Sequence, residues 1–281
     1  MTESESVVST GIRAIVTLCS TERVDHLRRQ LQAVRRHGDP RVRTIVVWVG
    51  DDKPPADLRV DRLVRVPPAT RGLRLAAARN AGANCAVRMG ARIIIFLDAD
   101  CVPGPDLVGC YVAAARMHPN AVLCGPVTYL EEGADVTDDA ELVALTRPHP
   151  ARPAPAKGVV VRATPDEYPL FWSLSFAMTA ATWRDIRHFD QRFEGYGAED
   201  TDFAFALRDE SVPLMWVGGA HAYHQHHNTS SPPVQHLDDI LRNGALFADK
   251  WLEWPMTGWL EAFEQSGAVV RADGGWKKAS A

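Results

Sequence analysis

The chain has 281 residues, of which 46% are hydrophobic and 23% are charged, as is typical of a globular protein with a substantial core. A formal net charge of −4 and a pI near 6.2 give no support for a nucleic-acid-binding protein, and no run of 18 apolar residues that would span a membrane is found. The five cysteines are odd in number and lack a C-x-x-C spacing, which favours free thiols in a reducing cytoplasm over a disulfide framework or a zinc site.

The N-terminal part of the chain alternates between strand and helix patterns. Residues 1–10 are polar and acidic, and we expect a flexible tail there. Buried strands are predicted at 12–18, 44–49, 63–66, 92–97 and 121–129, and helices at 24–37, 73–89 and 108–117. Alternation of this kind implies a mainly parallel sheet with helices on its faces and right-handed crossovers.

The strand at 92–97 ends abruptly in Asp98-Ala99-Asp100. Its apolar run predicts a central strand buried on both faces, and we expect residues 101–105 to continue neither strand nor helix. The two acids then lie at the carboxyl edge of the sheet, where open α/β folds bind ligands and where paired carboxylates can hold a divalent cation against a phosphate. The alternative is a solvated turn in which Asp100 caps a following helix. Asp51 follows another strand at the same edge.

An acidic stretch, Glu199-Asp200-Thr201-Asp202, follows the glycine-rich residues 195–198. The pattern predicts a loop that runs into a helix N-terminus, where acids are electrostatically favoured. These acids can be ordinary first-turn residues, but the two glycines favour close contact between the loop and another group.

Four histidines occur within residues 221–227, at the end of a strand predicted at 214–217 and its continuation. Such a cluster, in a chain with a D-x-D pair, favours metal binding. Strand alternation would place His224 and His226 on one face and His227 on the other. His224 is our candidate ligand, with His226 or His221 as alternatives.

Two segments are harder to interpret. Residues 148–169 are rich in proline and are predicted to form an excursion or a mobile lid rather than packed core. Residues 234–263 have a helical pattern with Trp251, Trp254 and Trp259. That segment either packs on the core, lines an acceptor groove or touches a membrane surface at its periphery. Residues 273–281 are predicted to be a tail.

These features together suit transfer of a group from a nucleoside diphosphate. Asp98 and Asp100 would hold a divalent metal that bridges the two phosphates, and a histidine ligand favours Mn²⁺ over Mg²⁺. An acid of the second loop would remove a proton from the attacking hydroxyl. Asp51 is placed to accept a hydrogen bond from a base, and Arg79 or Arg71 to contact phosphate or fix the acids.

The sequence also resembles the inverting GT-A glycosyltransferases of family 2 and the related β-1,4-galactosyltransferase and chondroitin-polymerase type of C-terminal acceptor module. Four segments carry the resemblance. They are residues 15–23, residues 72–82 with the D-x-D at 98–100, Gly197-Ala198-Glu199-Asp200, and Ala222-Tyr223-His224-Gln225. The resemblance implies a UDP-sugar donor, a hydroxyl acceptor and Mn²⁺ or Mg²⁺ as cofactor.

By position, the resemblance makes Asp200 the catalytic base, Glu199 its neighbouring acid, and Asp98, Asp100 and His224 the metal ligands. The candidate donor contacts are Thr17, Cys19, Arg23, Asp51, Arg79, Asp98 and Trp172. Thr17 and Cys19 stand where the family often has Pro and Asn, and Tyr196-Gly197-Ala198 replaces a Trp-Gly-Gly type of loop. These departures leave the donor sugar and the acceptor open.

We therefore predict a GT-A (Rossmann-like) α/β domain over residues 11–233, with a nucleotide-binding half at about 11–130 and an acceptor half at about 170–233. A helical, Trp-rich extension covers 234–281. The predicted function is metal-dependent, inverting transfer from a UDP-sugar to a hydroxyl, in the cytoplasm or at the inner face of its membrane. The alternatives are a non-catalytic nucleotide-sugar-binding module that presents its C-terminal segment to a partner and, ranked last, a sugar-1-phosphate nucleotidyltransferase, because the basic phosphate loop expected after the first strand is absent.

Overall fold

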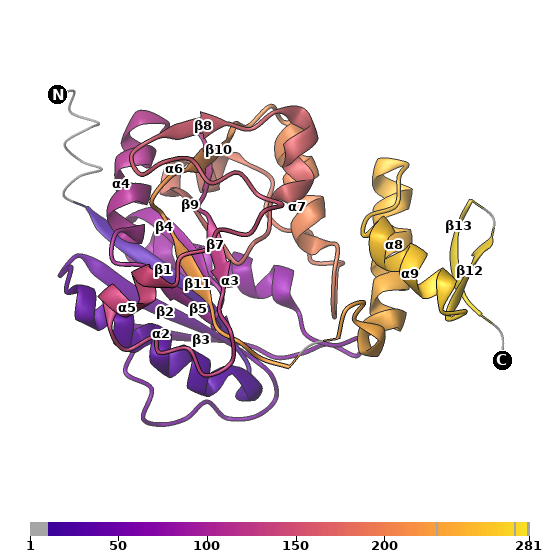
Figure 1. The fold of residues 1–281 in the computed structure, drawn as a ribbon, viewed down its shortest axis with the longest axis horizontal. Coiled ribbons are helices and arrows are strands. Elements are labelled where there is room, and N and C mark those ends of the chain that lie inside the picture. Colours follow the sequence, from indigo (N-terminus) through magenta and orange to yellow (C-terminus); the bar gives the residue numbers. More distant parts are fainter. Residues whose placement is uncertain (1–10, 229, 273, 280–281) are drawn as a thin grey trace.

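The computed structural model describes residues 11–228, 230–272 and 274–279, and within these ranges an eight-stranded sheet forms the centre of the fold (Figure 1). Its strand order is β3-β2-β1-β4-β9-β6-β10-β8. The strands are β1 (Ile12–Cys19), β2 (Val42–Val49), β3 (Arg62–Val66), β4 (Ala91–Leu97), β6 (Val122–Cys124), β8 (Val160–Arg162), β9 (Ser175–Thr179) and β10 (Leu214–Val217). All pairings are parallel except those of β9 and β8, which run antiparallel to their neighbours.

Helices cover both faces of the sheet, because the strands are apolar on both sides. One face carries α3 (Leu75–Arg88), α6 (Ala180–Asp185) and α7 (Glu199–Asp209), packed around Ile94 and Phe96. The opposite face carries α2 (Val24–His37) and α4 (Leu107–Met117), and Ile93 and Ile95 point into that side. The predicted fold class, a mainly parallel sheet flanked by helices, is thus confirmed. The predicted tail at 1–10 lies outside the described residues.

A second, three-stranded sheet lies beside the carboxyl edge of the first. It consists of β5 (Cys101–Pro103), β11 (Ala222–His224) and β7 (Val127–Tyr129), with β11 in the middle. The prediction that residues 101–105 form no strand is therefore wrong: β5 pairs with β11, and Pro103 ends the strand, where its missing N–H costs little. The predicted strand at 121–129 is in fact two, β6 and β7, separated by Gly125-Pro126.

The proline-rich segment at 148–169 is more closely tied to the core than predicted. Its second half contains β8, which pairs with β10, and the 3-10 helix η2 (Pro165–Leu170), whose Tyr168 hydroxyl donates to the Val212 carbonyl at 2.7 Å. The first half holds Arg152, which is 4% exposed. Since buried side chains and ladder hydrogen bonds fix these parts, the segment as a whole is not an unpacked loop. Two short elements remain to be placed, the 3-10 helix η1 (Thr21–Arg23) after β1 and α5 (Asp139–Ala144) before this segment.

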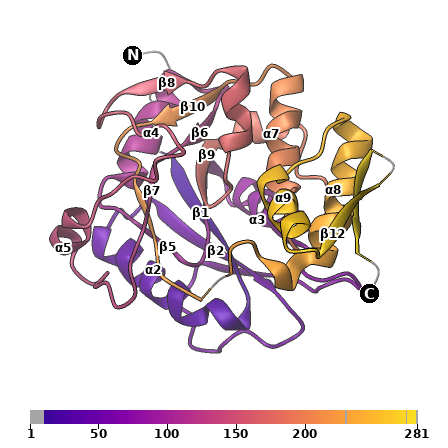
Figure 2. The same cartoon turned by 45° about the vertical axis from the view of Figure 1, so that its right-hand side comes forward.

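The C-terminal segment forms a small lobe beside α7 (Figures 1 and 2). It contains η3 (Val234–His236), α8 (Leu237–Trp251), α9 (Thr257–Gln265) and the hairpin β12 (Val269–Ala272) and β13 (Gly275–Lys278). The predicted tail thus contains a strand. The tryptophans face protein: the Trp251 indole N–H donates to Asp202 at 2.8 Å, and Trp254 packs over Gly244 and Gly275. In the described residues no helix has the length and apolar character needed to cross a membrane.

Candidate active site

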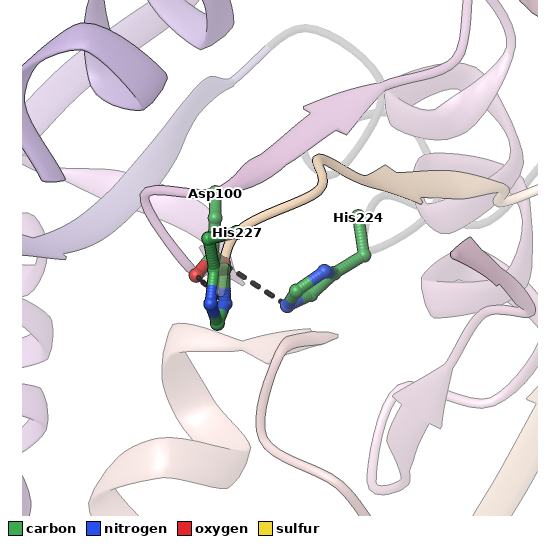
Figure 3. Close-up of side chains that lie close together, drawn as sticks. All are labelled: Asp100, His224 and His227. Atoms are coloured by element: carbon green, nitrogen blue, oxygen red, sulfur yellow. Dashed lines mark ion pairs between the residues drawn. The ribbon is translucent and has the colours of Figure 1, made fainter. Parts of the chain in front are cut away.

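The carboxyl edge of the sheet brings one carboxylate and two imidazoles together (Figure 3). The Asp100 carboxylate lies 3.6 Å from His224 Nε2 and 3.4 Å from His227 Nε2. Their candidate ligand atoms all lie within 4.8 Å of one another. Asp100 stands in the turn between β4 and β5, and His224 ends β11, which pairs with β5 at Cys101. We call Asp100, His224 and His227 the metal corner. One carboxylate with two imidazoles is a ligand set that suits a transition ion such as Mn²⁺ or Zn²⁺ better than Mg²⁺.

The charged groups of the metal corner favour the ionised form of Asp100. Burial on its own would raise the pKa of Asp100, but the contact with His227 and the charges of His224 and Arg23 outweigh it and lower the pKa to about 2. Burial lowers the pKa of His224, which favours the neutral, metal-binding form, whereas the hydrogen bond with Asp100 raises the pKa of His227. The Arg23 guanidinium, 3.3 Å from Asp100, compensates the charge of the carboxylate.

The structure differs from the predicted ligand set at several residues. Asp98 is not part of the cluster; its carboxylate faces Arg79 at 3.7 Å instead. The two alternative histidines also lie elsewhere, since His221 shares a 2.7 Å hydrogen bond with Thr128 and His226 is exposed. Strand alternation past His224 does not predict His227 as a ligand, because β11 ends at His224. The H-x-x-H spacing of His224 and His227 is the signal that the sequence offered.

A second group of acids, two of them at the N-terminus of α7, surrounds Arg79 of α3. Arg79 is 4% exposed and donates to Glu199 Oε1 at 3.0 Å. Burial and the neighbouring charge of Glu199 raise the pKa of Asp200 to about 6, although Arg79 opposes the change. Burial likewise raises the pKa of Asp98 to about 7, against Arg79. One arginine therefore faces three carboxylates, and Asp200 is poised to take up a proton near neutral pH.

The residues before these acids, 194–198, form what we call the acceptor loop, and α8 holds it by its backbone. The Asn243 amide nitrogen lies 3.0, 3.1 and 3.0 Å from the carbonyl oxygens of residues 194, 196 and 197, which share its two N–H groups. The Tyr196 N–H donates to Asp239 at 3.1 Å, and Arg242 donates to the Glu194 carbonyl at 2.6 Å. Ala198 has φ +71°, in the left-handed region that costs a residue with a Cβ about 1–2 kcal/mol. The position of Glu199 and Asp200 thus depends on a helix about 40 residues further along the chain.

Three of the predicted donor contacts lie at or beside the metal corner, and the other four lie elsewhere. Arg23, Arg79 and Asp98 lie at the metal corner or among the acids beside it, as described above. Asp51 is exposed after β2, and Trp172 is half-buried before β9. Thr17 and Cys19 are each 1% exposed; the Thr17 hydroxyl donates to Gln30 at 2.8 Å, and burial raises the pKa of Cys19 to about 12. This geometry does not favour a direct donor contact for those two side chains, which instead support the strand end.

Solved structures share this architecture. GalNAc-T7, in a crystal structure with UDP, GalNAc and Mn²⁺, superposes with a TM-score of 0.59 and 15% identity over 93% of this chain and 52% of that one. S. aureus TarS 1–349 in complex with UDP-GlcNAc superposes with a TM-score of 0.55 and 13% identity over 84% of this chain and 66% of that one. The fold is therefore that of the GT-A glycosyltransferases.

Sequence comparison identifies the family within this fold. Residues 16–164 match the profile of glycosyl transferase family 2, and the chain belongs to that family. Validoxylamine A glucosyltransferase of Streptomyces hygroscopicus subsp. jinggangensis (strain 5008) is 28% identical over 159 residues, which are 51% of this chain and 37% of the relative. The same enzyme of subspecies limoneus is also 28% identical. The chain thus spans about a third of the length of these curated relatives, and the family match includes Asp98 and Asp100 but ends before Glu199.

Proposed function

We propose that this chain is a metal-dependent, inverting glycosyltransferase that moves a sugar from a UDP-sugar to a hydroxyl acceptor. The observation that carries the proposal is the placement of two complementary sites at one sheet edge. The metal corner offers ligands for a divalent cation, and the α7 N-terminus offers a carboxylate whose pKa is raised to about 6. Membership of glycosyl transferase family 2 supports the reaction class, and the two solved neighbours were crystallised with UDP or a UDP-sugar.

Each group has a distinct role in this proposal. Asp100, His224 and His227 would hold the cation, which would neutralise charge on the departing diphosphate. Arg23 adds positive charge at the same place. Asp200 accepts the proton of the acceptor hydroxyl as that oxygen attacks the anomeric carbon, and Arg79 fixes the neighbouring Glu199. Because the base acts on the acceptor side, a single in-line displacement follows, with inversion at the anomeric carbon.

Two finer predictions belong to this proposal. The acceptor loop resembles that of β-1,4-galactosyltransferases and chondroitin-type polymerases, which supports a glycan or other carbohydrate acceptor. Mn²⁺ is the expected ion, because two imidazole ligands disfavour Mg²⁺.

The test is UDP binding and UDP release with and without Mn²⁺. We expect Mn²⁺ to tighten UDP binding by at least about tenfold in the wild type and not in Asp100→Asn, since a carboxylate ligand is lost. Release of UDP from a UDP-sugar should require both Mn²⁺ and an acceptor. Asp106→Asn, an exposed acid outside the site, is the matched control. Mn²⁺-independent binding would contradict the metal corner, whereas binding without any turnover on a broad acceptor panel would favour the non-catalytic module instead.

A further inference from the structure

Arg152 is a buried cation that has no hydrogen-bond or ion-pair partner for its side chain among the described residues. It is 4% exposed, and all three guanidinium nitrogens are buried without an acceptor. The guanidinium lies over two indole rings, 5.2 Å from the centroid of Trp172 and 5.3 Å from that of Trp216. These cation–π contacts stabilise the charge but do not satisfy its N–H donors. The indole N–H of Trp216, which is 0% exposed, has no acceptor either.

A cluster made only of donors calls for an acceptor from outside the chain. Unsatisfied buried N–H groups are rare in folded proteins, and a buried charge without a counter-ion is more costly still. The group that satisfies both demands is an anion with several acceptor oxygens, and a planar guanidinium pairs in bidentate fashion with a carboxylate or a phosphate. We call Arg152, Trp172 and Trp216 the arginine recess.

The arginine recess adjoins the metal corner on the side away from the first strands. The Asp98 N–H donates to the Leu174 carbonyl at 2.9 Å, so Trp172 leaves the sheet edge directly beside the D-x-D turn. A series of ring contacts also joins the two sites. Tyr129 stacks on His224 at 4.5 Å and meets His149 at 5.5 Å, and His149 meets Trp172 at 5.0 Å.

The strand order shows which part of a donor would face the recess. Asp51 and Arg23 follow β2 and β1, on one side of β4. Trp172 and Trp216 lie on the other side, before β9 and on β10. A nucleotide held over β1 and β2, with its diphosphate at the metal corner beyond β4, would extend its sugar toward β9. The anion that meets Arg152 is then carried by the sugar.

We propose that the arginine recess binds a carboxylate on the donor sugar, so that the donor is a nucleoside-diphosphate hexuronate. The inference rests on the proposed function, because the orientation of the donor follows from the metal corner. Trp172 is the half-buried member of the recess, and its ring centroid lies 5.2 Å from the guanidinium carbon. The carboxylate replaces a missing acceptor, whereas a neutral hydroxymethyl group would leave the charge of Arg152 uncompensated.

The experiment compares UDP-glucuronate, UDP-glucose and UDP in the presence of Mn²⁺, with the wild type, Arg152→Met and Arg152→Lys. We expect the wild type to bind the uronate about 10- to 100-fold more tightly than the glucose donor, the range expected for a charge-assisted hydrogen bond. Arg152→Met should remove this preference and leave UDP binding unchanged, and Arg152→Lys should keep part of it. Arg147→Met, at an exposed arginine just before the proline-rich segment, should behave as the wild type.

Thermal unfolding without ligand separates recognition from a structural role. If the guanidinium awaits a ligand, Arg152→Met removes an uncompensated charge and should melt at the same temperature as the wild type or higher. A clear drop in melting temperature, or failure of Arg152→Met to fold, would show that the two indoles need the cation for packing and would overturn the proposal.

The remaining outcomes are also decisive. Equal binding of the two sugars, with Mn²⁺-dependent UDP binding intact, contradicts the arginine recess and leaves the proposed function standing. Absence of Mn²⁺-dependent UDP binding in the wild type contradicts both. Acetate titration tests the other source of the same chemistry: if acetate stabilises the wild type but not Arg152→Met and no uronate preference exists, the recess takes a free anion and not the donor sugar.

Discussion

The metal corner and the acceptor loop lie at the same edge of one fold but are held in different ways. In the metal corner, Asp100 just before β5, His224 at the end of β11 and His227 shortly after it meet directly, and the pairing of β5 with β11 sets the spacing of Asp100 and His224. The acceptor loop is held mainly through its backbone rather than through its own side chains. Hydrogen bonds from Asn243 and Arg242 of α8 fix the backbone carbonyls of residues 194, 196 and 197.

Because the two regions are held differently, mutations in them should affect binding and turnover differently. Damage to the metal corner should weaken binding of metal and nucleotide. Damage to the acceptor loop or to α8 should leave binding nearly intact and slow turnover, because Glu199 and Asp200 follow the loop directly. The C-terminal lobe, which the sequence suggests as an extension, is therefore expected to be needed for catalysis.

Asp200→Asn should have the largest effect of any single change. An amide cannot accept the proton of the acceptor hydroxyl, and loss of a general base typically costs about 10²- to 10⁴-fold in rate. Turnover should fall by that amount, while UDP-sugar affinity measured by calorimetry changes less than about twofold. Asp249→Asn, at an exposed position of α8, serves as the control. Normal turnover by Asp200→Asn would move the base elsewhere.

His227→Gln tests the residue that joins the metal corner unexpectedly. Loss of one of two imidazole ligands should weaken Mn²⁺ binding by about 10- to 100-fold and raise the Mn²⁺ concentration needed for activity. At saturating Mn²⁺ the rate should recover largely. The neighbouring exposed histidine gives a matched control, since His226→Gln should change neither quantity. Equal Mn²⁺ affinities of the two variants would exclude His227 as a ligand.

The rate should depend on pH through the acceptor side. Asp200 has a pKa raised to about 6 by burial and by Glu199, and it works as a base only when ionised. Below pH 6 the rate should therefore fall, approaching about tenfold per pH unit. Glu199→Gln removes a repelling charge, so it should shift this fall to lower pH. A profile of kcat/KM from pH 4.5 to 8 measures both, and a flat profile in the wild type would contradict the assignment.

Asn243→Leu should separate the two regions most clearly. It removes the amide that donates to the acceptor loop and leaves the part-buried carbonyls of residues 196 and 197 without this donor, at a cost of about 1–3 kcal/mol each if they find no other, while the Glu194 carbonyl keeps Arg242. We expect kcat to fall about tenfold or more with Mn²⁺-dependent UDP binding preserved. Arg242→Ala, which removes fewer of these contacts, should show a smaller effect. If UDP binding fell as far as kcat in Asn243→Leu, the loop and the metal corner would not be independent.

The sequence predicts the metal corner better than the acceptor loop for a physical reason. The apolar run of β4 marks a central strand, and the acids after it must lie at the sheet edge whatever the rest of the chain does. His224 follows another strand to the same edge. His227 was missed because its place depends on where β11 ends, and strand ends are set by pairing with β5 and β7 rather than by local preference.

Contacts between distant parts of the chain were beyond the sequence patterns. Nothing in the amphipathic spacing of α8 indicates that Asn243 would point at the carbonyls of a loop formed much earlier. Arg152 likewise lies in a proline-rich stretch that predicts exposure, and its burial arises from tertiary packing that places the rings of Trp172 and Trp216 against its guanidinium. Local patterns report which face of an element is buried, but the partner of a polar group is decided by tertiary packing.

Ala198→Gly should give the smallest effect and is the finest test of how the acceptor loop is held. Ala198 has φ +71°, which glycine adopts without strain, so the substitution should stabilise the protein by about 0.5–1 kcal/mol after the extra chain entropy of glycine is counted. Ala204→Gly, inside α7, should destabilise by about 1 kcal/mol and gives the opposite sign. Chemical denaturation measures both. If α8 alone fixes the loop, kcat of Ala198→Gly stays within about twofold of the wild type; a larger fall would mean that the strained Ala198 itself helps to aim Asp200.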